Sequence, residues 1–556
     1  MTGGSPGPDL PDAAEWRDVS VRYPFQERPV LASVTMALRR GERLLLLGPS
    51  GSGKSTLLAT LTGLVPQAVP ARVEGDIRLG GAPVPSRTPA EWADRVAFLF
   101  QDADQTLCGM TVADEIAFSL ENRGLPEQDI RARVDAAMQS LGLPQPWRPR
   151  RTATLSGGEK QFVAIAAAVA QDAPILVADE PTASLAREAA GKLHGLVEAH
   201  PGSVLIVDHR LDGLIGLVDR VVLIDRDGRL AAEGEARHFF REHDDRLRAM
   251  GVWRPVASLL DAALRRHGID LPQPPLSVEE ALCQLPHAQS PMHAAAIGAL
   301  DDFARTRMAP QRTETGPELV SLHGAACAPL FGPVVLTDVS LSVRAGEVVA
   351  ILGRNGAGKS TLAASLAGLL RLKGGRRKGR PAGLAFQNPE SQFTAGSVEE
   401  ELAAAAGGQP GTAERRAKVD ALLHLWKLDG LAARHPFELS YGQKRRLALA
   451  TLTADDRWPC LVLDEPTAGL DAAGAEAIAQ RIAELAASGR AVVLVTHEID
   501  FALRLCSRAV VVDGGGIAFD GPMAELALDR ALLERAGLAE PGIAPVLRWL
   551  ERQAAC

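Results

Sequence analysis

One phosphate-binding pattern occurs twice in this chain of 556 residues. Residues 48–56 read GPSGSGKST and residues 353–361 read GRNGAGKST. Each follows an apolar run, at 43–47 and 348–352, that predicts a buried strand. Glycines let successive main-chain N–H groups converge on a phosphate, and the positive end of the next helix adds to the attraction. A glycine-rich turn could imitate one copy by chance but not two, so the chain is predicted to bind nucleoside triphosphate in at least two places.

The polar residues of each loop have distinct expected roles. Lys54 and Lys359 should reach the terminal phosphates, and the Ser55 and Ser360 hydroxyls should contribute to a Mg2+ site. The residues expected to cradle the nucleotide are Gly48, Pro49, Ser50, Gly51, Ser52, Gly53, Lys54, Ser55 and Thr56 in the first loop, and Gly353, Arg354, Asn355, Gly356, Ala357, Gly358, Lys359, Ser360 and Thr361 in the second.

Further landmarks repeat after each loop in the same order. The offsets between the copies lie between 284 and 288 residues for four pairs: Gln101 and Gln387, Ser156 and Ser440, Asp179 and Asp464, and His209 and His497. Because a fixed order at near-constant spacing is the mark of an internal repeat, the chain is predicted to contain a duplicated domain.

Two acidic residues end an apolar strand in each half. Asp179 and Asp464 can hold Mg2+ through water, and Glu180 and Glu465 can orient and polarise an attacking water. An acid that caps a helix is the alternative interpretation. It explains one acid, but not an Asp-Glu-Pro-Thr sequence at matching offsets in both halves.

Together these motifs resemble the nucleotide-binding domain of ATP-binding-cassette (ABC) proteins. Each half has a Phe-Gln pair, then a signature stretch (LSGGEKQ at 155–161, LSYGQKR at 439–445), a strand ending in DEPT, and a strand ending in His. The resemblance implies an α/β fold with two tandem P-loop NTPase domains. Each would have a RecA-like core, an antiparallel β subdomain and a helical subdomain, followed by a short C-terminal helical extension.

The same resemblance implies the cofactors ATP and Mg2+ and assigns roles to residues. Glu180, Glu465, His209, His497, Gln101 and Gln387 would be catalytic, and Ser55, Gln101, Asp179, Ser360, Gln387 and Asp464 would surround the metal. Tyr23 would stack on adenine. Signature residues Ser156, Gly157, Gly158, Ser440 and Gly442 would face the nucleotide held by the other half in a head-to-tail pairing, so that Lys54 works with Ser440 and Lys359 with Ser156.

The halves depart from the family pattern in different places. Tyr441 replaces the first signature glycine of the second half, and Ala183–Ala186 lacks the Asp that the second half keeps at Asp471. The stretch Ser321–Gly324, matched to Tyr23, offers no aromatic residue beyond His323. We therefore expect unequal sites, with faster turnover at the Lys54 site and unequal residual rates in single Glu180→Gln and Glu465→Gln variants.

The region between loop and glutamine also differs. The first half has an alternating, hairpin-like run at 73–84, whereas the second is shorter and is predicted to keep 373–380 (KGGRRKGR) as a basic loop. With a net charge of -8, the chain gives no electrostatic case for nucleic acid, and a solvated turn is favoured over a nucleic-acid patch.

Two features resemble the ATPases of energy-coupling factor (ECF) importers. Asn388, Pro389 and Gln392 follow Gln387 as an N-P-x-x-Q stretch, which Asp102, Ala103 and Gln105 match more loosely. Residues 248–282 resemble the ECF C-terminal extension. This implies partners: a transmembrane coupling subunit and a small substrate-binding membrane protein, which carry a vitamin, a vitamin precursor, or a cobalt or nickel ion. A soluble twin-cassette translation factor and a twin-cassette sugar importer ATPase remain as alternatives.

Composition sets the expected location and the domain limits. Six cysteines form no CxxC pair, the start lacks a signal-peptide pattern, and no apolar stretch reaches membrane-spanning length, so we expect a protein peripheral to the cytoplasmic face of the membrane. The expected segments are a disordered start at 1–14, cassettes at 15–240 and 317–525, extensions at 241–282 and 526–556, and a mobile linker at 283–316.

Overall fold

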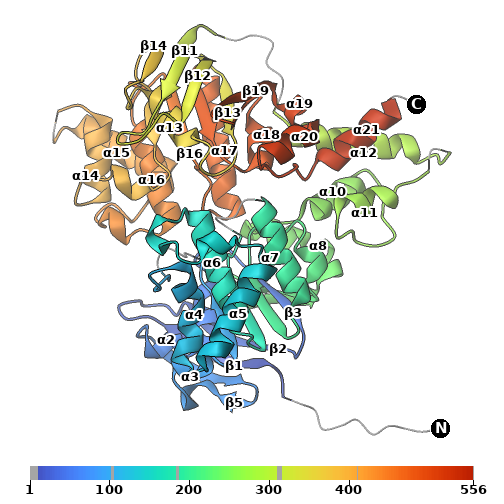
Figure 1. Cartoon of the computed structure of the whole chain (residues 1–556). Coiled ribbons are helices and arrows are strands. Elements are labelled where there is room, and N and C mark those ends of the chain that lie inside the picture. The colour runs from blue at the N-terminus through green and yellow to red at the C-terminus, as the bar shows by residue number, and fades with distance from the viewer. Residues whose placement is uncertain are drawn as a thin grey trace. The chain divides into compact units, whose positions relative to one another are not determined.

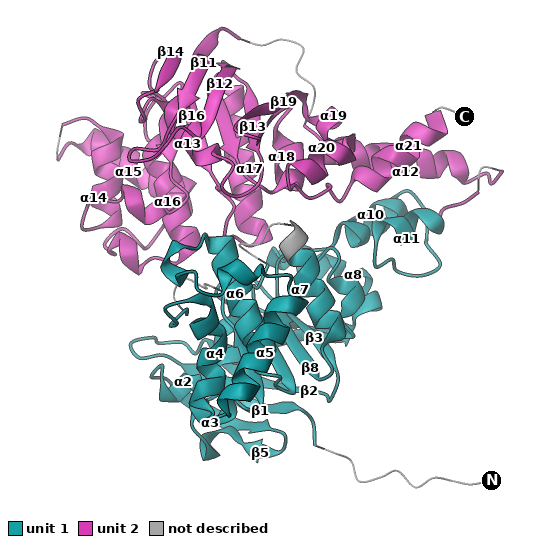
Figure 2. Ribbon diagram, in the orientation of Figure 1, with its two compact units in different colours: residues 1–284 teal, residues 285–556 magenta. Residues whose placement is uncertain are grey.

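The apolar runs that precede the two phosphate loops are central strands of two separate sheets. The computed structural model describes residues 11–101, 106–182, 187–287, 289–309, 316–409 and 411–554. The chain divides into two units, residues 1–284 and 285–556, each with one phosphate loop (Figure 2). This confirms the duplicated α/β architecture.

The main sheet of unit 1 has the strand order β10-β9-β3-β8-β7-β6. All neighbours are parallel except β9 and β10. The central strands are rich in Leu, Val and Ile, and all their residues are buried except the half-buried Arg43 at the start of β3, as expected for a sheet covered on both faces. The strands are β3 (Arg43–Leu47), β6 (Val96–Leu99), β7 (Ile175–Asp179), β8 (Ser203–Val207), β9 (Arg220–Ile224) and β10 (Leu230–Glu235).

A second, antiparallel sheet of unit 1 has the order β2-β1-β4-β5. It contains β1 (Ala14–Arg22), β2 (Leu31–Leu38), β4 (Arg72–Leu79) and β5 (Ala82–Pro83), so the alternating run at 73–84 is a hairpin as predicted. Trp16 of β1 is fully buried and donates through Nε1 to Thr60 Oγ1 at 3.0 Å. Thr60 belongs to α1 (Lys54–Leu61), so this bond ties the antiparallel sheet to the helix that follows the phosphate loop.

Three helices of unit 1 pack on one another. They are α4 (Val112–Asn122), α5 (Glu127–Ser140) and α6 (Gly157–Ala170). Capping boxes start α4 at Thr111 and α6 at Ser156, each with an acid three residues on. The other helices are α2 (Leu64–Gln67), α3 (Pro89–Trp92), α7 (Arg187–Ala199), α8 (Ala236–Glu242), α9 (Asp244–Met250), α10 (Val256–Arg266) and α11 (Val278–Cys283).

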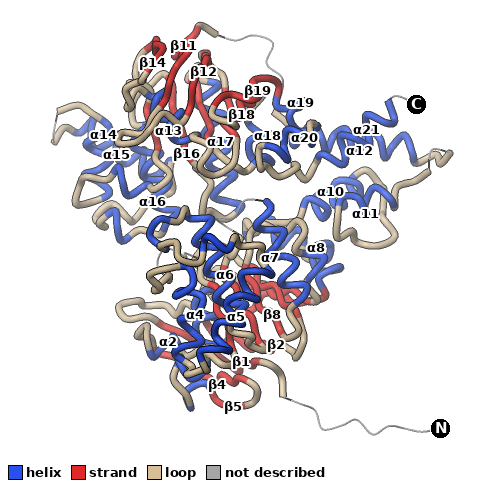
Figure 3. Tube along the Cα trace, viewed as in Figure 1, coloured by secondary structure: helices blue, strands red, loops and turns tan. Residues whose placement is uncertain are grey.

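Unit 2 repeats this plan with a smaller second sheet. Its main sheet, β15-β16-β17-β13-β18-β19, contains β13 (Val348–Leu352), β15 (Gly383–Ala385), β16 (Cys460–Asp464), β17 (Ala491–Val495), β18 (Arg508–Asp513) and β19 (Gly516–Pro522). The second sheet, β12-β11-β14, contains β11 (Glu318–Cys327), β12 (Leu336–Arg344) and β14 (Gly374–Gly379). Within this unit, α14 (Val398–Ala406), α15 (Ala413–Leu425) and α16 (Tyr441–Thr453) lie together, apart from β11, β12 and β14 (Figure 3). The remaining helices are α12 (His293–Arg307), α13 (Lys359–Ala367), α17 (Ala472–Ala487), α18 (Ile499–Leu505), α19 (Met523–Leu528), α20 (Arg530–Arg535) and α21 (Ala544–Ala554).

The basic run at 373–380 is not the loop we predicted, because most of it forms strand β14. This strand pairs with β11 in antiparallel register, with Arg377 opposite Leu322. Arg377 is partly buried and donates from Nε to Leu366 O at 2.7 Å and from Nη1 to Gly379 O at 3.0 Å. Pairing with a neighbouring strand outweighs the poor strand propensity of this sequence.

The stretch expected to be a mobile linker, 283–316, contains the 15-residue helix α12. Ala296, Ala299, Leu300, Phe303 and Ala304 of this helix are buried. The helix lies beside α21, as Figure 1 shows. The apolar spacing of three and four residues makes α12 a packed part of unit 2.

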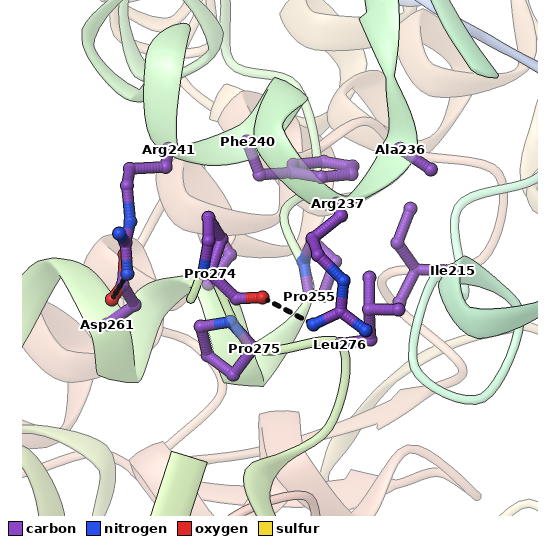
Figure 4. Close-up of a pocket in the computed structure, with 11 residues that line it drawn as sticks. Ile215, Ala236, Arg237, Phe240, Arg241, Pro255, Asp261, Pro274, Pro275 and Leu276 are labelled. Atoms are coloured by element: carbon purple, nitrogen blue, oxygen red, sulfur yellow. Dashed lines mark hydrogen bonds and ion pairs between the residues drawn. The ribbon is translucent and has the colours of Figure 1, made fainter. Parts of the chain in front are cut away.

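Two arginines of α8 bind the following segment, which contains α10 and α11 (Figure 4). Arg241 of α8 donates from Nε and Nη2 to the two carboxylate oxygens of Asp261 of α10, at 2.9 and 2.6 Å. Arg237 donates to Pro274 O at 3.0 Å and pairs with Glu280 of α11 at 2.5 Å. The Asp261 carboxylate is only 2% exposed, so its pairing with Arg241 is needed to stabilise the buried negative charge.

Arg241→Ala is expected to destabilise α10 locally by on the order of 2–3 kcal/mol, because among the described residues it leaves the buried Asp261 carboxylate with one ion-pair partner, Arg265, 3.5 Å away. Hydrogen exchange of the α10 amides measures this opening. Arg131→Ala is the matched control. Its pair with Glu127 is largely exposed, so its loss should cost less than about 0.5 kcal/mol. Equal exchange rates in Arg241→Ala and the unaltered chain would contradict the argument.

Candidate nucleotide site

Each phosphate loop joins a central parallel strand to a helix. In unit 1, Gly53 adopts a φ of 91° directly before α1, and Lys54 donates from Nζ to Gly48 O and Pro49 O, both at 2.9 Å. In unit 2, Lys359 Nζ donates to Gly353 O at 2.7 Å and to Arg354 O at 3.1 Å. Both lysine side chains are therefore folded over their own loop.

Burial gives these lysines an unusual environment. Lys54 and Lys359 are each only 7% exposed. Burial lowers the pKa of Lys359, while the charges of Glu465 and Asp464 oppose that shift. A buried ammonium group beside carboxylates is suited to bind a further anion such as a phosphate.

Space as well as backbone conformation makes glycine necessary at one loop position. A Cβ on Gly53 would lie 2.7 Å from Leu31 Cδ2 and 2.8 Å from Val30 O. Gly51 also has a positive φ, of 80°, but a Cβ there would meet nothing within 4 Å. The loop is thus closely packed at Gly53 and open at Gly51.

The two strand-end aspartates stand opposite the loop hydroxyls. Asp179 ends β7 and Asp464 ends β16, and both are buried. Burial raises the pKa of Asp179 to about 6, although a hydrogen bond from Ser55 opposes the shift. The pKa of Asp464 is raised for the same reason and opposed by Ser360. In the described part of the chain, Asp179 Oδ1 is buried without a hydrogen-bond partner.

This donor set fits Mg2+. A hydroxyl and a carboxylate with an unpaired buried oxygen suit a hard cation that keeps several waters and completes its shell with phosphate oxygens. No group of three or more His, Cys, Asp and Glu side chains forms a metal-binding cluster among the residues that the structure describes. Ser55 with Asp179, and Ser360 with Asp464, could therefore hold Mg2+ together with a nucleotide.

Glu180 and Glu465 follow the aspartates with the same strained backbone. Their φ angles are 47° and 48°, and each main-chain N–H donates at 2.8 Å, to Val207 O and Val495 O respectively. Glu180 Oε1 lies 2.7 Å from His209 Nε2, and Glu465 Oε1 lies 2.8 Å from His497 Nδ1. The structure thus brings the predicted Glu and His together in both units.

The histidines keep these glutamates ionised. Burial alone would raise the pKa of Glu180, but the hydrogen bond and charge of His209 and the charge of Lys54 leave that pKa below its usual value. The pKa of Glu465 is lowered against burial in the same way, by His497, Lys359 and Thr496. Ionised carboxylates are the form that can accept a proton from water.

The second contact of each glutamate differs between the units. Gln101 Nε2 donates to Glu180 Oε2 at 2.9 Å, whereas Glu465 Oε2 accepts from Thr496 Oγ1 at 3.0 Å. Unit 1 has Asp208 at the position of Thr496, and this buried carboxylate accepts from Thr182 Oγ1 at 2.7 Å. The sequence did not single out Thr496 or Asp208, although the VDH and VTH strand ends place both next to the predicted histidines.

The signature serines are helix caps in both units. Ser156 accepts from Glu159 N, and Ser440 accepts from Gln443 N. Gly157, Gly158 and Gly442 lie in the first turns of α6 and α16. The first turn of a helix presents N–H groups that can bind an anion.

Tyr23 lies beside the first loop, but the counterpart we assigned to it was wrong. Its hydroxyl is 3.0 Å from Thr56 Oγ1. Val21 pairs with Leu31, and Cys327 pairs with Leu336, so the turn that contains Tyr23 corresponds to residues 328–335. His323 instead lies within β11, opposite Arg376. The corresponding turn contains Phe331, which is 97% exposed. Leu31 and Leu336 lie at the same distance in sequence before the first glycine of their phosphate loops, and this spacing could have identified the corresponding turn.

Some predicted features lie outside the described residues. These are Asp102, Ala103 and Gln105 after Gln101, and Ala183–Ala186 after Thr182. Asp471 is described, and it accepts from Gly474 N at 2.8 Å as the N-cap of α17.

The geometry of both sites agrees with the comparisons to known proteins. The family model described as ABC transporter matches residues 31–183 and 336–468. The chain belongs to the ABC transporter family. Domains of this family bind ATP, generally with Mg2+, and the chain is an ATPase with two cassettes.

Relatives match along nearly the whole chain. "Putative HMP/thiamine import ATP-binding protein YkoD" of Bacillus subtilis is 33% identical over 543 residues, which cover 94% of each chain. A "Putative ABC transporter ATP-binding protein" of Streptomyces coelicolor is 35% identical, over 92% of this chain and 94% of that one. Among solved structures, an RNase-L inhibitor is 20% identical with a TM-score of 0.60, over 96% of this chain and 98% of that one, which shows a shared fold.

Gly53→Ala is expected to weaken ATP binding at the first loop by roughly a hundredfold, since the new methyl group collides with Leu31 and Val30 in addition to straining the backbone. Gly51→Ala adds strain without a collision and should cost about tenfold or less. Binding of a fluorescent ATP analogue in a Lys359→Ala background measures both. Equal losses in the two variants would refute the role of close packing at Gly53.

Proposed function

We propose that this ATPase is the energy-coupling subunit of an ECF-type importer and carries both nucleotide-binding domains in one chain. Transmembrane partners would take up a vitamin, a vitamin precursor or a transition-metal ion. ATP binding would bring the halves together and hydrolysis would release them, at the cytoplasmic face of the membrane. No described helix is long and apolar enough to cross a bilayer.

The observation that carries this proposal is the match to the HMP/thiamine import relative. The match spans 94% of both chains, which is more than the two cassettes alone would cover. That relative's name supports a vitamin or vitamin precursor as the solute class.

The stretch after Gln387 supports a docking role. Asn388 Oδ1 accepts from Glu390 N at 3.0 Å and thereby caps a short 3-10 helix, Pro389–Gln392. Gln392 donates to Ala448 O of α16 at 2.9 Å, and Lys444 of α16 pairs with Glu390 at 2.5 Å. These contacts fix the N-P-x-x-Q stretch to the signature helix, so a membrane subunit docked on the stretch would act on that helix directly.

Within each cassette we assign the following roles. Lys54 and Lys359 bind the terminal phosphates, and Glu180 and Glu465 accept a proton from the attacking water. His209 and His497 orient these glutamates and keep them ionised. Mg2+, when bound, neutralises charge that develops on the phosphates. We further propose that Tyr23 and Phe331 offer aromatic faces to adenine.

Thr496→Val tests the role of Glu465. The variant removes a hydrogen bond to the ionised carboxylate, so the pKa of Glu465 rises. Because the rate falls as pH drops through that pKa, the acid limb of the pH–rate profile should move to higher pH. The profile is measured in a Glu180→Gln background, which leaves the Lys359 site active.

Thr496→Ser keeps the donor and is the matched control, so its profile should follow that of the unaltered residue. An acid limb that stays in place in Thr496→Val would show that Glu465 does not set the pH dependence.

The transport assignment is tested by co-purification. A tagged chain purified from gently solubilised native membranes should bring down one hydrophobic coupling subunit and one small membrane protein, identified by mass spectrometry. The Lys54→Ala/Lys359→Ala chain should keep its partners while losing ATP turnover. Recovery of ribosomal proteins without a membrane partner would reject the importer and favour a translation factor.

A further inference from the structure

Unit 2 buries an arginine directly behind its nucleotide site. Arg445, in the second turn of the signature helix α16, has no exposed surface. Charged side chains are seldom buried this completely unless they are paired. Main-chain oxygens take the place of a carboxylate here. The guanidinium donates to Phe386 O at 2.7 Å, to Gln387 O at 2.6 Å and, more weakly, to Asp464 O at 3.4 Å.

Tyr441 completes the arrangement. This residue replaces the first signature glycine, and its hydroxyl donates to Gln387 O at 3.2 Å and accepts from Arg445 Nη2 at 3.1 Å. The guanidinium also lies 5.5 Å from the centre of the Tyr441 ring. Gln387 O therefore receives two donors, both from the first two turns of α16.

Tyr441 also contacts the loop that follows β16. A Cβ on Gly469 would lie 2.8 Å from Tyr441 Cδ1, so the ring rests against the main chain of this glycine, whose φ is 71°. Three segments thus meet at two side chains: the Gln387 segment, the end of β16 at Asp464, and the loop at Gly469.

Unit 1 lacks these residues and positions its glutamine differently. Gly157 and Gln161 occupy the positions of Tyr441 and Arg445. A Cβ on Gly157 would meet nothing within 4 Å, and Gln161 donates to Pro181 O at 3.3 Å. In that unit the Gln101 side chain bonds Glu180 directly.

We propose that Arg445 and Tyr441 are positioning residues for ATP hydrolysis at the Lys359 site, where they hold the main chain of Phe386 and Gln387 against the end of β16. In unit 1 the Gln101 side chain bonds Glu180 directly, whereas in unit 2 the Arg445 guanidinium and the Tyr441 hydroxyl hold the Gln387 segment through its main-chain oxygens. Because both side chains belong to the signature helix, a shift of that helix moves Gln387 with it. The proposal uses the ATPase activity and the proposed role of Glu180, and it does not depend on transport.

The test uses single-turnover hydrolysis by the full-length chain in a Glu180→Gln background, so that the Lys359 site is observed. Arg445→Gln, which installs the residue of unit 1, should lower the rate constant about tenfold or more, with the ATP concentration at half-maximal rate changed less than about twofold. Tyr441→Phe, which removes one partly exposed hydroxyl, should lower it roughly threefold. Arg445→Lys should recover part of the loss, because an ammonium group reaches only some of the oxygens that a guanidinium fork reaches.

Arg446→Gln is the matched control. Arg446 is the next residue of the same helix, and it also donates to main-chain oxygens, those of Trp426 and Lys427. Its rate constant should stay within about twofold of the background. Background chains that hydrolyse no ATP would show that the Lys359 site does not turn over without an active Lys54 site, so the variants are then compared in the otherwise unaltered chain.

Two outcomes overturn the proposal. One is an unchanged rate constant in both Arg445→Gln and Tyr441→Phe. The other is an equal loss in Arg446→Gln and Arg445→Gln, which would indicate general destabilisation of α16. If Arg445→Gln does not fold, Tyr441→Phe alone decides, with thermal unfolding of that variant expected within about 2 °C of its background.

Discussion

Parallel hydrogen bonding of β7 to β8, and of β8 to β3, determines where the polar groups of the first site stand. Asp179 pairs with Val207, and Leu45 pairs with Ile206, so the three strands end at one edge of the sheet. The phosphate loop, the Asp-Glu pair and His209 each follow one of these ends. β13, β16 and β17 repeat the arrangement in unit 2, with Asp464 opposite Val495. A slip of one residue in any of these pairings would turn the acids away from the loop.

That edge also concentrates groups that are costly to bury. A lysine, an aspartate and a glutamate are buried or nearly so in each site, and they influence one another's pKa. The attraction between the lysine and the two acids offsets part of the cost of removing them from water. The left-handed backbone at Glu180 and Glu465 is a second cost, and the main-chain bonds to Val207 and Val495 stabilise it. A site arranged in this way is ready to receive an anion with its cation.

The motif residues could be predicted because their chemistry requires fixed residue types at fixed spacing. The loops, the strand-end acids and the histidines all lie where the sequence indicated. Helix α12 was missed because Pro, His and Gln on its flanks suggested a linker. Strand β14 was missed because its basic residues have little strand propensity of their own. The burial of Arg445 depends on oxygens 58 and 59 residues away in the sequence, and no local pattern reports such a contact.

Strand β14 also affects how the edge of its sheet can interact with other chains. It is one of the two terminal strands of the sheet β12-β11-β14, and a terminal strand is where a foreign strand can add. Arg376 and Lys378 are exposed there, and a strand of like charge from a second copy would be repelled. Glycines at both ends of β14 further weaken it as a template. At its β14 edge, the shortened sheet of the second cassette is therefore protected against edge-to-edge self-association by the same basic residues that led us to predict a loop.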